Sequence, residues 1–161
     1  TSNEVESQVF FKLLPSSIIA IDVLRDAFPD TPSVFLYREP VQVLVSNLRF
    51  KNDTKSGPGP YCTTGMKNSF SKGQMSEHLV QKVSQVGLNP DDLSLEEYCA
   101  AYLGTLLDFA LYGSEANSHD ANPLALLDYK DITATSLFEL FEFHFGLPAP
   151  STAEAKQRVE A

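Results

Sequence analysis

The chain has 161 residues, a formal net charge of −9 and a hydrophobic content of 43%, which together suit one globular domain. These values exclude a disordered tail, a collagen-like fibre and a low-complexity linker. The acidic balance also argues against general affinity for nucleic acid or for anionic membranes. We therefore treat residues 1–161 as a single domain. Because the chain does not begin with Met, we expect it to be a segment of a longer protein.

The first half of the chain alternates between strand and helix patterns. The apolar run at 9–11 predicts a strand, and Pro15 opens a helix with apolar residues at helical spacing. Residues 33–37 are a continuous apolar run, typical of a strand buried on both faces. Pro40 suits the first position of the next helix. Residues 51–75 are rich in Gly, Pro, Ser and Lys and predict a long loop, a kind of segment that is usually functional or disordered.

The second half continues this alternation. Helices are predicted from Ser76 to about 87 and from Ser94 to about 112, the latter opened by a capping box. A buried strand follows at 124–129, then a helix at 133–145 and a polar terminal helix at 150–161 with its own capping box. The pattern predicts an α/β fold, a parallel sheet flanked by helices. Because three strands leave exposed edges, we expect further strands from an upstream segment or a partner.

The junction at Arg38 carries the clearest chemical signal. Six basic and two acidic residues fall between Arg38 and Lys72, which favours a small anionic ligand. Arg38 follows a strand, where ligands of open parallel sheets bind, and precedes a helix whose free amides attract anions. Ser46 lies two turns into that helix and can add a hydroxyl donor. Together they predict a phosphate site; the alternative is that Arg38 caps a carbonyl and Ser46 packs.

A resemblance to a known family rests on the same residues. Leu36-Tyr37-Arg38-x-Pro40 with Ser46 eight positions after Arg38 resembles the 3′-phosphate-binding motif of sulfotransferases that use 3′-phosphoadenosine 5′-phosphosulfate (PAPS). Three further elements are similar to the family pattern and come in its order: Phe28-Pro29-Asp30, Tyr129-x-Asp131 and Gly146-Leu147-Pro148. The resemblance runs from about Val9 to Pro148.

The resemblance implies a P-loop NTPase-like sulfotransferase fold in which Arg38 and Ser46 bind the 3′-phosphate of PAPS. Lys12 matches a lysine near the transferring sulfuryl group and is the candidate catalytic residue. The acceptor would be a hydroxyl or amine of a small molecule or glycan, and no metal is implied.

The chain also departs from the family. No Lys-Ser-Gly-Thr loop for the 5′-phosphosulfate precedes Arg38, and Thr54-Lys55-Ser56-Gly57 follows a helix and is not that loop. We therefore interpret the chain as the C-terminal portion of the fold, incomplete at its N-terminus, with the loop upstream or on another chain. Leu14 stands where many members have a catalytic histidine.

Other candidate residues receive structural interpretations. We assign no catalytic role to His78, His119 or His144, of which His144 lies among aromatic residues and favours packing. Tyr129 and Asp131 favour packing and capping over contact with substrate. Two cysteines are too few for a disulfide framework, so we interpret Cys62 as a loop thiol and Cys99 as a core thiol. This favours a reducing, cytoplasmic location and leaves a secretory lumen open.

Two other functions stay open. The first is a degenerate sulfotransferase-like module that acts as a non-catalytic interaction or scaffold domain, which Leu14 and the missing loop favour. The second is a relative of the P-loop kinases, which is disfavoured because neither a Walker loop nor a magnesium-holding acid is visible. Nucleotide binding separates the enzyme from the scaffold.

Overall fold

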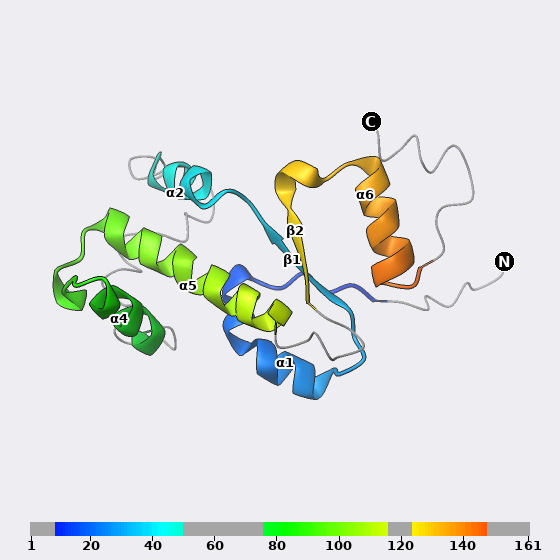
Figure 1. Cartoon of the computed structure of the whole chain (residues 1–161), viewed down its shortest axis with the longest axis horizontal. Coiled ribbons are helices and arrows are strands. Elements are labelled where there is room, and N and C mark those ends of the chain that lie inside the picture. The colour runs from blue at the N-terminus through cyan, green and yellow to red at the C-terminus, as the bar shows by residue number, and fades with distance from the viewer. Residues whose placement is uncertain (1–8, 50–75, 116–123, 148–161) are drawn as a thin grey trace.

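The computed structural model describes residues 9–49, 76–115 and 124–147 (Figure 1). The first of these ranges holds η1 (Pro15–Ala20), α1 (Ile21–Ala27), β1 (Ser33–Tyr37) and α2 (Pro40–Arg49). The second holds α4 (Ser76–Gln85), η4 (Pro90–Asp92) and α5 (Leu95–Glu115). The third holds β2 (Leu124–Asp128), η5 (Tyr129–Asp131), α6 (Ala134–Glu139) and the π-helical η6 (Leu140–His144). The loop at 51–75 and the terminal helix at 150–161 lie outside the described residues.

A small parallel sheet joins the two halves of the chain. β1 and β2 pair in parallel, with Ser33 opposite Leu124 and Tyr37 opposite Asp128. The α/β class and the parallel pairing are therefore confirmed. Among the described residues the sheet has two strands, and the finer P-loop NTPase-like topology stays a prediction. None of the described helices has the length and apolar character that crossing a bilayer requires.

The predicted strand at residues 9–11 is wrong. These residues are irregular and have no strand pairing within the described part of the chain. The Phe10 ring instead packs edge-on against Phe141 and Phe145, with centroid distances of 5.9 and 5.6 Å. The apolar run thus finds its partners in aromatic side chains next to α6, a stabilising arrangement that needs no backbone ladder.

The hydrophobic core is built around α5. This helix packs against α2, α4, η1 and β2, while α6 lies across the strands from it (Figure 1). The buried apolar residues are Ile18, Ile21, Leu79, Val83, Leu93, Tyr98, Cys99, Tyr102, Leu106, Ala110 and Leu124.

Both strands are less covered than their apolar sequences predict. Leu36 of β1 is 52% exposed and Leu126 of β2 is 36% exposed. The prediction of strands buried on both faces is wrong for these residues, because the described helices cover only part of the two-stranded sheet.

The helix ends follow the local capping patterns. The Ser94 amide donates to Glu97 Oε2 at 2.8 Å and the Glu97 amide donates to Ser94 Oγ at 3.1 Å, which confirms the predicted capping box. Thr133 and Ser136 form a second, reciprocal box at the start of α6. Thr133 therefore caps this helix, and the interpretation of Asp131 as its cap is wrong.

The interpretation of Cys99 as a free core thiol is wrong. Cys99 is fully buried on α5 and is disulfide-bonded. Cys62, the other cysteine of the sequence, lies outside the described residues. Because disulfides persist in oxidising environments, this bond removes the reason for favouring a reducing cytoplasm.

His144 connects η6 to the sheet, in keeping with its interpretation as a packing residue. Its Nε2 lies 2.9 Å from the carbonyl oxygen of Ser33, and its ring packs edge-on against Phe145 at 5.1 Å. Since a carbonyl only accepts, Nε2 carries the proton and donates.

Replacement of His144 tests this connection. We expect His144→Phe to lower the free energy of unfolding by about 1 kcal/mol, because it removes a partly buried hydrogen bond but keeps the aromatic contact. Urea denaturation measures the change. His144→Gln, which keeps a donor, should retain more stability, and an unchanged midpoint for His144→Phe would contradict the assigned bond.

Candidate functional site

A cavity of about 300 Å³ opens at the carboxyl ends of β1 and β2, between α2 and α5. In open parallel sheets this end is where ligands bind. Side chains from α2, α5 and β1 form its apolar walls: Phe35, Val43, Leu103, Leu106 and Leu107. Its polar lining comprises Arg38, Asn47 and the phenols Tyr37, Tyr102 and Tyr129. The cavity is therefore the candidate site.

Arg38 borders this cavity and is held from two sides. It follows the last residue of β1, and its Nε donates to Gln42 Oε1 at 2.9 Å. Its guanidinium carbon lies 5.8 Å from the centroid of the Tyr129 ring, within the range of a cation–π contact. The bond to Gln42 uses one of the five guanidinium N–H donors, so donors remain for an anion.

Tyr129 has a larger part in the site than its sequence interpretation gave it. It follows β2 as the first residue of η5, and the residue is 58% exposed. Its ring supports the Arg38 guanidinium rather than packing in the core. The parallel pairing of β1 and β2 produces this contact, because it places the two strand ends next to each other.

Ser46 lies on the same face of α2 as the residue that holds Arg38. Gln42 and Ser46 are four positions apart in the helix, which places them one turn apart on one face. Ser46 is exposed, and it does not line the cavity, toward which α2 presents Pro40, Val43 and Asn47. Gln42 and Ser46 thus form a polar row on α2, and Arg38, which donates to Gln42, also lines the cavity.

The first amides of α2 are already paired. The Glu39 carboxylate accepts from the amides of Val41 at 3.1 Å and Gln42 at 2.7 Å. The expectation of free amides for an anion is therefore wrong. Glu39 directly precedes Pro40, and an acidic side chain at this position satisfies the orphan donors and the helix dipole. An anion at Arg38 would bind without these amides and beside a like charge.

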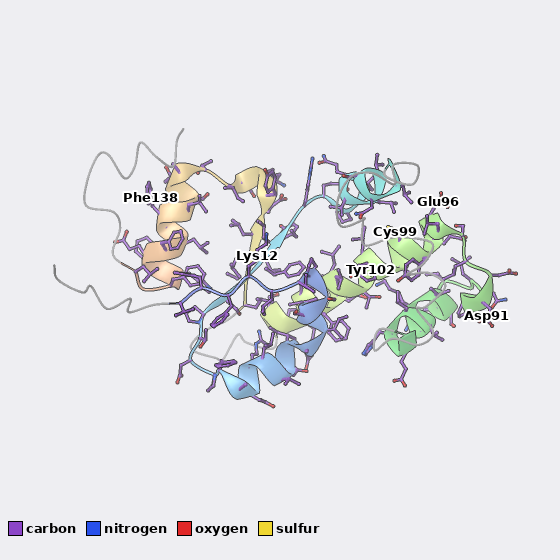
Figure 2. All side chains as sticks on the ribbon, turned by 180° about the vertical axis from the view of Figure 1, so that it is seen from behind. Lys12, Asp91, Glu96, Cys99, Tyr102 and Phe138 are labelled. Atoms are coloured by element: carbon purple, nitrogen blue, oxygen red, sulfur yellow. The ribbon has the colours of Figure 1, made fainter. Side chains whose placement is uncertain are left out.

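Lys12 is not joined to the other predicted site residues. It is exposed on the irregular segment that leads into η1, whereas Tyr102 and Cys99 lie along α5 (Figure 2). Among the described residues no hydrogen bond or ion pair connects Lys12 with Arg38 or Ser46. The role of Lys12 stays a prediction. Thr54, Lys55, Ser56, Gly57 and His119 lie outside the described residues.

His78 lies in a different part of the molecule. Its ring packs edge-on against Phe109 at 4.7 Å, beside a second cavity of about 260 Å³ between α4 and α5. Lys82 and Asp108 form an ion pair at this second cavity.

An ion pair fixes the charge at the end of β2. Lys130 Nζ lies 2.9 Å from Asp128 Oδ2, and the Lys130 amide donates to Asp128 Oδ1 at 3.1 Å. The side-chain hydrogen bond from Lys130 is the main cause that holds the pKa of Asp128 below its ordinary value of 3.8. The same bond raises the pKa of Lys130 above 10.5. Both groups are therefore charged at neutral pH.

The titration of Asp128 provides a direct test of this pair. A carbon-detected NMR titration of the Asp128 carboxyl should have its midpoint below 3.8. Because the pKa of Asp128 is lowered in the folded state, the ion pair stabilises the fold at pH values above the ordinary pKa of 3.8. This stabilisation is lost as the pH falls through the folded-state pKa. Lys130→Met should return the midpoint toward the ordinary value; a midpoint that this substitution leaves unchanged would contradict the assigned cause.

Sequence reasoning missed the contribution of α5 to the cavity. Leu103, Leu106 and Leu107 are apolar residues of a long helix and carry no signal that separates cavity from core. Gln42 was also missed, because a glutamine on a polar helix face has no distinctive pattern. The one local signal for Gln42 was its position four residues after Arg38, a spacing at which side chains can meet.

Comparisons with known proteins add no relative: no family model matches the chain, and neither a curated protein nor a solved structure is significantly similar to it. Within the described ranges, no group of three or more His, Cys, Asp or Glu side chains is placed to hold a metal ion. Function is therefore proposed from the motifs of the chain and the geometry of its strand ends.

Proposed function

We propose that the chain is the nucleotide-holding, C-terminal portion of a PAPS-dependent sulfotransferase. The observation that supports this most is the position of Arg38, which follows a parallel strand, borders a cavity and reaches the helix face that carries Ser46. Arginine and serine at this spacing resemble the family's 3′-phosphate motif, and the strand end is where such ligands bind.

The polar row on α2 has suitable chemistry for a terminal phosphate. The free donors of Arg38 form charge-assisted bonds with a phosphate, and its planar fork permits two parallel bonds. Ser46 adds a hydroxyl donor. Gln42 accepts from Arg38 through Oε1, so its amide N–H groups remain as further donors on the same face. Arg38, Gln42 and Ser46 together form the proposed 3′-phosphate site.

The proposed reaction is in-line sulfuryl transfer. The acceptor oxygen or nitrogen forms a bond to sulfur while the bond from sulfur to the 5′-phosphate oxygen breaks, and the acceptor proton passes to a base. Lys12 would stabilise charge on the sulfuryl group, and positioning supplies the rest of the rate enhancement. Leu14 cannot take the proton. The base and the 5′-phosphosulfate loop are therefore proposed to come from the upstream half of the fold or from another chain.

A calorimetric titration of the whole chain tests the proposal. 3′-Phosphoadenosine 5′-phosphate (PAP) should bind at least roughly tenfold more tightly than adenosine 5′-phosphate (AMP), because only PAP carries the phosphate that Arg38 recognises. Low ionic strength is used because screening weakens exposed charge pairs. Equal affinities would reject the 3′-phosphate assignment.

A second candidate function is a sulfotransferase-like interaction module without catalysis. The capped N-terminus of α2 favours it, since the Glu39 carboxylate uses the amides that an anion would otherwise contact. Such a module would give no heat and no thermal shift with PAP. The same titration therefore separates the two candidates.

A further inference from the structure

The cavity beside Arg38 combines apolar walls with one positive charge. Leu103, Leu106 and Leu107 of α5 face Val43 of α2 across it, and Phe35 of β1 contributes a ring. Among its lining residues Arg38 is the one with a charged side chain. This combination suits a different ligand from the polar row on α2.

We propose that this cavity binds an aromatic monoanion, with its ring between α2 and α5 and its anionic group on Arg38. Carboxylates and sulfonates of ring systems are the chemical class. The proposal goes beyond sulfuryl transfer, because it requires only the cavity and Arg38 and not the nucleotide.

The walls favour an apolar ligand body. A volume of about 300 Å³ is at the lower end of small-molecule sites and holds about ten water molecules. A sugar or peptide in this space would place hydroxyl or amide groups against leucine and valine side chains, where they would lose hydrogen bonds. An apolar ring loses none and displaces the water.

The mouth of the cavity favours an aromatic anion. Tyr129 lies against the Arg38 guanidinium at 5.8 Å, so a planar cation and a phenol ring border the same opening. An aromatic ring attracts a guanidinium to its face and packs edge-on or offset against a phenol ring. A carboxylate or sulfonate can pair with the guanidinium in a bidentate manner. A single charge on the ligand matches the single charge in the lining.

Naphthalene-2-sulfonate and its neutral sulfonamide are the probes, titrated calorimetrically into the whole chain. Val43→Trp and Leu107→Trp fill the cavity from opposite sides, and each should weaken sulfonate binding at least roughly tenfold. Val80→Trp, at an exposed position of α4, is the matched control and should leave binding unchanged. Arg38→Met should weaken sulfonate binding roughly tenfold and leave sulfonamide binding unchanged.

Several results would overturn the proposal. These are no binding to the unmodified chain, equal affinities for sulfonate and sulfonamide, or equal affinities across the three tryptophan variants. Should a filling variant unfold, intermolecular NOEs between naphthalene protons and the methyl groups of Leu103 and Leu107 decide the matter, and their absence rejects the site. If the chain binds naphthalene-2-sulfonate but not PAP, the nucleotide function alone is rejected. If it binds PAP but not naphthalene-2-sulfonate, this inference alone is rejected.

Discussion

Arg38→Ala is expected to weaken binding of PAP by roughly 10- to 100-fold and to change AMP binding less than about twofold. The reason is chemical: the guanidinium is proposed to form charge-assisted bonds with the 3′-phosphate, which AMP lacks. The PAP affinity of Arg38→Lys should lie between those of the unmodified chain and Arg38→Ala, because lysine keeps the charge but loses the planar fork and the bond to Gln42.

Matched variants make this result specific. Ser46→Ala should weaken PAP binding by a smaller factor, roughly three- to tenfold, since a hydroxyl donor to an anion contributes less than a paired cation. Lys82→Gln also removes one positive charge, but from a lysine that pairs with Asp108 between α4 and α5. It should have little effect on the affinity for PAP or for AMP. Equal losses of PAP and AMP affinity in Arg38→Ala would count against the 3′-phosphate site.

Loss of the disulfide at Cys99 is expected to lower the free energy of unfolding by about 2–4 kcal/mol. For a chain of this size, that corresponds to a fall in melting temperature of roughly 5–15 °C. The effect should be large because Cys99 lies in the middle of the core around α5, and a cross-link there limits the conformations of the unfolded chain. Calorimetry of the unmodified chain with and without a reductant measures it.

Cysteine variants separate the cross-link from packing. Cys99→Ala removes both the bond and a buried sulfur, whereas Cys62→Ala leaves the Cys99 sulfur in place. If the two cysteines pair, neither single variant nor the double variant should respond to reductant, and Cys99→Ala should melt below Cys62→Ala because it also loses the buried sulfur. Val83→Ala, a core truncation, should be destabilised but keep its response. An unmodified chain that melts at one temperature under both conditions would contradict the prediction.

The site is partly ordered by its own contacts before any ligand binds. Arg38 is held by Gln42 and Tyr129, and the first amides of α2 are held by Glu39. This arrangement orients the guanidinium in advance, which lowers the cost of binding. The carboxylate of Glu39 opposes an incoming anion at the same time, so the charge on Arg38 must outweigh this repulsion. The measured nucleotide affinities will report the balance.

Sequence patterns alone were sufficient for the features that depend on neighbouring residues. The strand at 33–37 and the start of the helix at Pro40 were predictable because apolar runs and a proline at the first helical position act locally. The capping box at Ser94 likewise involves residues three positions apart. The place of Arg38 between a strand and a helix followed from these boundaries, and with it the location of the candidate site.

The contacts between distant segments became known from the fold. The pairing of β1 with β2 places Tyr129 against Arg38, and the packing of α5 on α2 encloses the cavity with leucines that resemble ordinary core residues in the sequence. Tertiary packing also determined the surroundings of Phe10 and the disulfide at Cys99. Each of these contacts depends on the free energy of packing between side chains that are far apart along the chain, and local periodicity and spacing do not contain that information.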